Sequence, residues 1–269
     1  MQNIVNMVHI FMKNRDLISQ FVKREIIARY KGSYLGIIWS FLNPLLMLSV
    51  YTFVFSEIFK AKWSSGVDES KIEFALVLFC GLITFNIFSE TVSRAPSLII
   101  SNPNYVKKVV FPVEILPIIS MGSSLFQFLI NLIILFLGVF LFLGAVHWTI
   151  VFLPLVLLPI VLLSMGISWF LASLGVYLRD IAQIISIAVQ AIMLISPIFY
   201  SVSSIPQKFR IIYDLNPISY VVEDMRRIII WGQLPQWGWL VSGTILSLFI
   251  FFIGYFWFRK TRQGFADVL

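Results

Sequence analysis

The chain has 269 residues, of which 59% are hydrophobic and only 12% are charged, and its mean hydropathy is +0.92. A water-soluble domain carries roughly 25% charged residues, so this composition excludes an ordinary soluble protein and indicates a multispanning membrane protein. The net charge of +7 does not indicate nucleic-acid binding, because the Lys and Arg residues gather at the ends of apolar stretches, where they orient a membrane protein. A single cysteine excludes a disulfide framework and a cysteine metal cluster, and we expect no metal site and no cofactor.

The first 35 residues are expected to lie on the cytoplasmic side, with no cleavable signal peptide. Within them, residues 16–31 form an imperfect amphipathic pattern, which predicts a helix in the membrane interface. Glu25 and Arg29 fall inside its apolar arc four residues apart, so we expect them to pair with each other. The helix is either a simple surface anchor or also contacts a cytoplasmic partner, and its candidate residues are Arg24, Glu25, Arg29 and Lys31.

Six apolar stretches are each long enough to cross a bilayer, since a span needs about 20 apolar residues and unpaired backbone in lipid forces a helix. They cover residues 36–58, 73–93, 112–143, 148–178, 181–200 and 239–258. The distribution of Lys and Arg favours a cytoplasmic position for both termini. We therefore expect an all-α, polytopic membrane protein of one domain, with a six-span bundle over 36–258 and a cytoplasmic tail over 259–269.

The cytoplasmic loop over residues 94–111 contains a second candidate helix. Asn102 followed by Pro103 is a typical helix start, because asparagine caps the first turn and proline suits the first helical position. Phe111 and Pro112 would end it. Such a helix across the inner mouth of the bundle is either a mechanical contact point or part of an ordinary basic loop.

The outer loop over residues 201–238 is too long for a plain connector. A helix start at residues 216–217, and the spacing of Glu223 from Arg226 and Arg227, predict one or two short helices. They form either a salt-bridged surface helix or a gate over an exit path. Aromatic residues near this surface form either an interfacial belt or flat faces for a passing sugar chain. The path candidates are Phe199, Tyr200, Tyr213 and Trp231.

The chain lacks the motifs of an ATPase or a hydrolase, with no P-loop, no HExxH and no GxSxG. Its acidic residues near spans lie at the span ends, whereas the polar residues within spans are neutral and more often bond between helices than bind substrate. These neutral residues are Asn43, Asn86, Gln127, Asn131 and Gln190. Ion coupling therefore lacks its residues, and the energy for any transport is expected from another protein.

Several short motifs occur in a characteristic order along the whole chain. They lie at residues 29–36 with Trp39 and Pro44, at 102–112, 178–180, 196–200, 216–217 and 264–267. Together they resemble the permease subunits of type-2 ABC exporters that move lipid-linked polysaccharides such as O-antigen, capsule and teichoic acid.

The resemblance implies a non-enzymatic, homodimeric permease of the bacterial inner membrane, each copy paired with a separate P-loop ATPase and exporting an undecaprenyl-linked polysaccharide. It implies that the helix over 16–31 lies at the inner mouth and that the outer helices lie near the exit. It also implies a coupling helix that seats in the ATPase, made of Asn102, Pro103, Asn104, Tyr105, Lys107 and Lys108. The alternatives are a permease of the same fold for a small molecule or drug, a membrane-embedded glycosyl- or acyltransferase, and an ion-coupled carrier.

Overall fold

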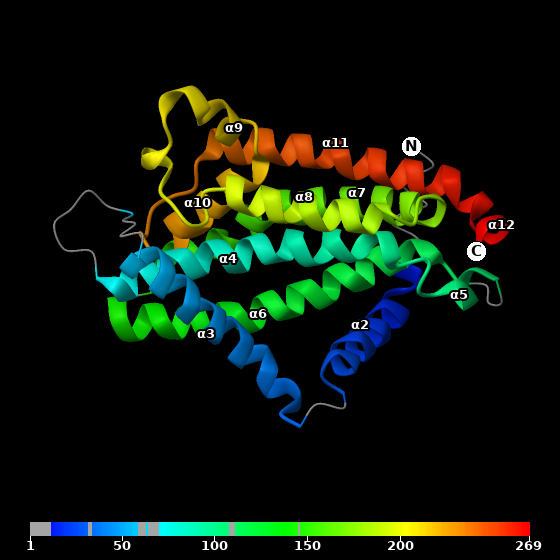
Figure 1. Ribbon diagram of the computed structural model, residues 1–269, viewed down its shortest axis with the longest axis horizontal. Helices are drawn as coiled ribbons and strands as arrows, with labels where there is room; N and C mark the ends of the chain where they lie inside the picture. Colours follow the sequence, from blue (N-terminus) through cyan, green and yellow to red (C-terminus); the bar gives the residue numbers. More distant parts are fainter. Residues whose placement is uncertain (1–11, 32–33, 59–62, 64–69, 108–110, 145) are drawn as a thin grey trace.

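The computed structural model describes residues 12–31, 34–58, 63, 70–107, 111–144 and 146–269. These residues form helices and no strands, which confirms the all-α fold. The long helices of the bundle lie side by side along the longest axis of the molecule (Figure 1). They are α4 (Lys71–Arg94), α6 (Leu116–Leu143), α7 (Leu153–Tyr177), α8 (Ile181–Ile195) and α11 (Trp237–Thr261).

The other helices lie beside this bundle or at its two ends (Figure 1). α2 (Arg15–Tyr30) and α3 (Trp39–Thr52) both diverge from the bundle along one side. α5 (Pro103–Lys107) and α12 (Phe265–Val268) lie at one end, and α9 (Arg210–Asp214) and α10 (Pro217–Ile229) lie at the other. The segments predicted to be cytoplasmic and the segments predicted to be outside are therefore at opposite ends of the molecule.

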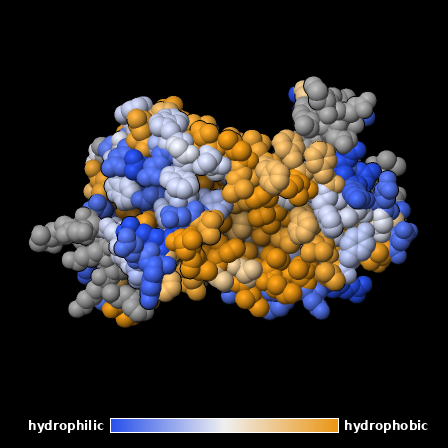
Figure 2. Space-filling view, turned by 90° about the horizontal axis from the view of Figure 1, so that it is seen from above, coloured by the Kyte–Doolittle hydropathy of each residue, from blue (hydrophilic) through white to orange (hydrophobic). Residues whose placement is uncertain are grey.

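A band of apolar surface separates two hydrophilic ends (Figure 2). On α11 the exposed apolar side chains include Val241, Ile245, Phe249 and Ile253, one helical turn apart. Within the described part of the chain, five helical segments are long and apolar enough to cross a membrane, and they match five of the six predicted spans. These segments are Gly36–Ile58, Lys71–Ser97, Val113–Leu143, Trp148–Tyr177 and Trp237–Val268.

The remaining predicted span, over residues 181–200, contains α8, which has only 15 residues. The helix ends at Ile195 because Ser196 precedes Pro197 and adopts an extended conformation, with φ −71° and ψ 145°. A bilayer crossing needs about 20 helical residues. The sixth crossing therefore stays a prediction.

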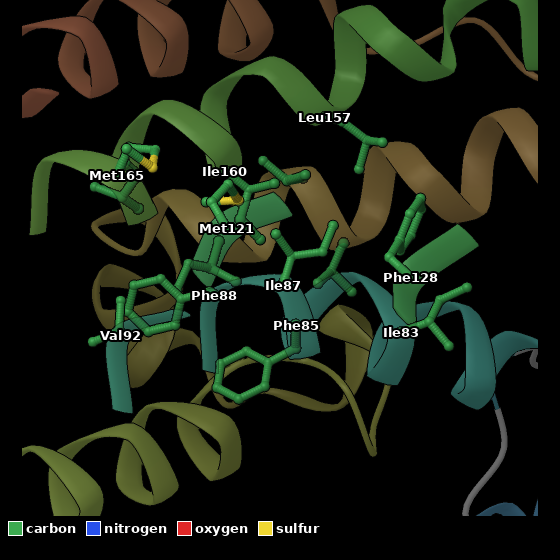
Figure 3. Packing of buried hydrophobic residues seen from close by; sticks show 14 of the residues in the cluster. Ile83, Phe85, Ile87, Phe88, Val92, Met121, Phe128, Leu157, Ile160 and Met165 are labelled. Atoms are coloured by element: carbon green, nitrogen blue, oxygen red, sulfur yellow. The ribbon is translucent and has the colours of Figure 1, made fainter. Parts of the chain in front are cut away.

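α4 is the central helix of the bundle, and its side chains form the middle of the apolar core. Figure 3 shows Ile83 and Phe88 of α4 on the side of α6 and α7, near Phe128, Met121 and Ile160, while the buried Phe85 ring points to the opposite side of α4. This burial removes most of α4 from lipid. In the apolar stretch of the span that contains α4, 72% is buried, against 6% for the span that contains α3. Among the five candidate spans, the segment that contains α3 is therefore the least buried within one copy of the chain.

α7 and α11 cross in direct backbone contact at two glycines. A Cβ atom on Gly254 would lie 1.9 Å from the carbonyl oxygen of Gly166, and one on Gly166 would lie 2.6 Å from the carbonyl oxygen of Ile250. Small residues allow such close helix pairs in membranes, where packing rather than water drives association. The crossing explains why these two helices pack together along most of their length.

α10 packs inside the end of the bundle opposite α5 and α12. Asn216 begins it by accepting a hydrogen bond from a backbone N–H two residues on, at 3.1 Å, as predicted for an asparagine before a proline. Val222, Met225 and Ile228 of this helix are fully buried, and the helix contacts α4 and α7. The prediction of short helices between residues 201 and 238 is confirmed, whereas the alternative of a surface helix is wrong for α10, which is buried.

Candidate functional site

A groove with an empty volume of about 1240 Å³ lies where α3 diverges from α4 and α6. Its apolar wall includes Met47 and Tyr51 of α3 and Phe79 of α4. Its polar lining is unusual for the middle of a membrane protein, because amide side chains from three helices face the same space. The polar lining consists of Arg29, Tyr30, Ser40, Asn43, Asn86, Gln127 and Asn131.

Gln127 joins three helices at one side of this groove. Its Oε1 accepts a hydrogen bond from the Tyr30 hydroxyl at 2.7 Å. Its Nε2 donates to the backbone oxygen of Ser40 at 3.0 Å and to Oδ1 of Asn131 at 3.3 Å. Gln127 therefore behaves as predicted for a neutral polar residue within a span, because it bonds between helices.

Asn43 and Asn86 do not behave in that way. Both side chains are exposed to the groove and have no hydrogen-bond partner among the described residues. Asn86 is exposed in the middle of α4, the most buried helix. An unpaired amide in hydrocarbon costs several kcal/mol, so these two side chains indicate that water or a polar ligand occupies the groove.

Ion pairs fix α2 to the bundle at the arginine end of the groove. Arg29 pairs with Glu90 of α4 and donates to the Ser123 hydroxyl of α6 at 3.0 Å. Glu25 pairs with Arg94 of α4 at 2.5 Å. The prediction that Glu25 and Arg29 pair with each other is therefore wrong. Each finds an opposite charge on α4 instead, because both side chains point at the bundle rather than along the helix surface.

An aromatic cluster connects α2 to the predicted coupling segment. Tyr105 stacks on Phe111 at 4.6 Å, and the Phe21 ring of α2 lies 5.7 Å from Tyr105 and 5.4 Å from Phe111. Arg24 donates to the Tyr105 hydroxyl at 2.9 Å and lies over the Phe21 ring at 4.3 Å. This cluster brings the two segments that the sequence predicts at the inner mouth into direct contact.

The coupling segment itself contains a helix of five residues that begins at Pro103, as predicted. The Asn102 amide donates to the carbonyl of Leu98 at 2.9 Å. Asn104 and Lys107 are exposed at this end of the molecule. Lys31, which follows the last residue of α2, is also exposed. Lys108 lies outside the described residues.

Of the four predicted path residues, only Phe199 adjoins the groove. Its ring is buried and stacks on Phe55 at 4.7 Å with an interplanar angle of 14°. It also lies 5.3 Å from Tyr51, which lines the groove. Phe199 therefore lies beside the Tyr51 end of the groove, opposite Arg29.

The other three candidates are placed elsewhere. The Tyr200 hydroxyl donates to the carbonyls at the end of α8, at 2.6 Å to Ile195. Tyr213 contacts the Tyr220 ring at 5.2 Å, and Trp231 packs against the core after the end of α10. The structure thus does not bring the four aromatic residues together.

Arg226 is the residue whose environment the sequence predicts least well. It is fully buried, and its guanidinium donates to the carbonyl oxygens of Val77, Pro197 and Ile198 at 3.1, 2.7 and 3.0 Å. Glu223 pairs with it at 3.4 Å, as its i,i+3 spacing predicts. The spacing of the apolar residues in α10 could have predicted this burial. Arg226 lies four residues after the buried Val222, so the two side chains are on the same face of the helix.

Glu114 is a second buried charge, and it lies at a span end, where the sequence analysis places the acidic residues near spans. Glu114 is 1% exposed and pairs with Arg262 in the segment that follows α11. Trp169 donates its indole N–H to the backbone oxygen of Glu114 at 3.0 Å. Phe265 in the same C-terminal segment is fully buried, so the predicted tail folds back on the bundle. Within the described residues there is no group of His, Cys, Asp and Glu side chains that could hold a metal ion.

An all-helical bundle with an apolar belt and a polar groove inside it is the architecture of a multispanning membrane protein. The chain belongs to the ABC-2 type transporter family, whose profile matches residues 16–230.

Curated relatives cover almost the whole chain. It is 26% identical over 271 residues to the O-antigen export system permease protein RfbA of Myxococcus xanthus, with 98% of this chain and 99% of the relative covered. It is 25% identical over 256 residues to the RfbA protein of Klebsiella pneumoniae, with 94% and 95% covered. It is 27% identical over 237 residues to the polysialic acid transport protein KpsM of Escherichia coli, with 84% and 87% covered.

Proposed function

We propose that this chain is the membrane-spanning subunit of an ATP-driven exporter that moves an undecaprenyl-linked, O-antigen-like polysaccharide across the bacterial inner membrane. The observation that carries the proposal is the groove with the unpaired amides of Asn43 and Asn86. A polyhydroxylated chain offers many donors and acceptors to such amides as it passes. The names of the curated relatives, which are O-antigen export and polysialic acid transport proteins, support the same substrate class.

The chain carries no P-loop, so the energy comes from a separate ATPase subunit. The surface proposed to contact it comprises Asn102, Pro103, Asn104, Tyr105, Lys107 and Lys108. The aromatic cluster around Phe21 and Tyr105 would pass a movement of this surface to α2. The chain itself is not an enzyme in this proposal.

A second copy of the chain completes the exporter in this proposal. α3 exposes Phe41, Leu45 and Leu46 and buries little of its surface within one copy. Packing against α3 of a partner would give this helix the contacts that the other spans already have. Both termini are proposed to lie in the cytoplasm, because the basic residues predicted inside are at the α5 end of the bundle.

The second candidate is a type-2 ABC permease for a small molecule or drug. Such a ligand favours a closed apolar pocket with few polar groups. The groove is instead lined by several amides and an arginine. The observation therefore favours a polar, extended substrate.

Replacing Asn43 and Asn86 together with leucine should reduce export of the polymer roughly thirtyfold, because each of the two lost hydrogen bonds to substrate is worth about 1 kcal/mol. Leucine has the same number of side-chain heavy atoms as asparagine and the same branch at Cγ, but it offers no hydrogen bond. The measurement compares surface polymer with lipid-linked polymer retained inside the cell. Gln190→Leu on α8 is the matched control, because its side chain is exposed and does not line the groove. Normal surface polymer in the double variant, or in a strain without this chain, would refute the proposal.

Reversing the charge at Arg29 should abolish export, because Arg29→Glu places two carboxylates face to face at the α2–α4 contact. The exchange of both charges, Arg29→Glu with Glu90→Arg, should restore part of the activity. Lys31→Glu is the control, since Lys31 is exposed two residues further on. Equal export by all three variants, measured at matched protein levels, would show that α2 is only a membrane anchor.

A further inference from the structure

A second cavity, with an empty volume of about 620 Å³, lies between α10 and the first turns of α11. It is separate from the groove, because the two share no lining residue. Volumes of this size are typical of sites for small ligands and headgroups. The cavity combines an acidic, aromatic wall with an apolar wall.

The aromatic wall is built by two stacked rings. Tyr220 of α10 stacks on Trp239 of α11 with 4.1 Å between ring centroids and an interplanar angle of 15°. The Tyr220 hydroxyl donates to Oδ1 of Asp214 at 3.2 Å. Trp239 is 45% exposed, so part of the indole stays open to a ligand. The hydrogen bond and the stacking together hold the Asp214 carboxylate beside the rings.

The lining carries two carboxylates and no basic residue. Asp224 is only 2% exposed, and its Oδ1 accepts a hydrogen bond from the Gln236 N–H at 2.9 Å. The nearest cation, Arg227, is 3.9 Å from this oxygen and donates its Nε–H to the carbonyl of Leu234. Burial raises the pKa of the Asp224 carboxyl. Within the described residues Asp214 has no ion pair, so the wall attracts a cation and repels a phosphate.

The cavity lies at the depth of lipid headgroups. α11 begins at Trp237 and is long and apolar enough to span the membrane, and its first turns provide Trp239, Gly243 and Leu246 to the lining. Half-exposed tryptophans at a helix end are typical of the membrane interface. A Cβ atom on Gly243 would meet nothing within 4 Å, and Leu246 is exposed. The cavity therefore opens along the lipid-facing surface of α11.

We infer that this cavity binds the ammonium headgroup of an ethanolamine phospholipid. The ammonium lies between the carboxylates of Asp214 and Asp224, beside the Trp239 ring, which adds a cation–π contact. The acyl chains follow the apolar surface past Gly243 and Leu246. The phosphate, two carbons from the ammonium, stays at the mouth in the headgroup layer. A soluble amine would leave the apolar wall uncovered, which favours a lipid.

The test uses the full chain in nanodiscs of phosphatidylglycerol with increasing amounts of phosphatidylethanolamine that carries brominated acyl chains. Bromine quenches tryptophan at contact distance, and native mass spectrometry counts the lipids retained. We expect saturable quenching by the ethanolamine lipid and preferential retention over phosphatidylglycerol. Asp214→Asn should weaken this binding roughly tenfold, as expected for the loss of a charge-assisted hydrogen bond. Gly243→Leu, which fills the space, should abolish it.

Asp180→Asn is the matched control, because Asp180 is an exposed aspartate that does not line the cavity. Asp214→Asn keeps the inference testable if Gly243→Leu fails to fold, since Asp214 is exposed and its amide can still accept from Tyr220. Equal binding of both lipids, or equal binding by Asp214→Asn and Asp180→Asn, would overturn the inference. Displacement of the lipid by a neutral oligosaccharide would overturn it in favour of a glycan site. The readout involves no transport, so it is independent of the proposed function.

Discussion

Arg226→Met is expected to destabilise the protein by about 3–5 kcal/mol, the range found when one partner of a buried charged network is removed. Methionine fills the apolar part of the site, but it donates no hydrogen bond. The carbonyls of Val77, Pro197 and Ile198 would then lose their common donor, and Glu223 would lose its partner. Thermal unfolding of the purified protein in detergent measures the effect.

The loss of stability should be greatest at the end of the bundle that contains α10. Arg226 joins α10, the start of α4 and the turn at 196–199, so its loss separates three segments that are distant in sequence. Arg226→Lys should recover only part of the stability, because an ammonium cannot reach three carbonyls with the fork geometry of a guanidinium. Arg227→Met on the same helix is the control, and we expect it to cost far less. Similar melting temperatures for Arg226→Met and Arg227→Met would contradict the assignment.

Gly254→Ala is expected to prevent α7 and α11 from packing, although it adds a single methyl group. The added Cβ would lie 1.9 Å from the carbonyl oxygen of Gly166, and backbone cannot move aside as a flexible side chain can. Overpacking typically costs about 1–3 kcal/mol and sometimes more, and here the two helices would have to separate along their length. We expect loss of the monodisperse peak in size-exclusion chromatography and a fall in membrane expression.

Gly238→Ala, in the first turn of the same helix, should instead increase the stability of the protein. Its Cβ would meet nothing within 4 Å, and alanine is favoured over glycine in a helix by up to about 1 kcal/mol. The comparison separates the helix preference of alanine from the steric effect at the crossing. Equal stability of the two variants would mean that the helices do not approach as closely as described.

The span boundaries were predictable because lipid imposes a simple rule on composition. Long runs without charge can only be helices. Four of them are found near the expected limits, and the last continues ten residues beyond its predicted end at residue 258. Asn216 was predicted to begin α10 by local chemistry alone, and its cap is present. The reduced length of α8 depends on Pro197, whose effect on Ser196 is local but was outweighed by the apolar run around it.

The contacts between segments were less predictable, because a one-dimensional pattern does not show which helix faces which. Glu25 and Arg29 are spaced to pair on one helix, yet each pairs with α4. Arg226 resembles a surface residue in sequence, and only the folding of α10 into the bundle buries it. Asn43 and Asn86 were recognised as polar residues within spans, but the divergence of α3 is what gathers them in one groove.

The aromatic cluster of Phe21, Tyr105 and Phe111 has a mechanical consequence. It ties the first half of α2 to the surface proposed for the ATPase, while Arg29 near the other end of the helix lines the groove. Eight residues of α-helix separate Phe21 from Arg29, a distance of about 12 Å along the axis. In the proposed exporter α2 would therefore act as a rigid lever, which carries a movement from the ATPase contact at Tyr105 to the Arg29–Glu90 contact beside the groove.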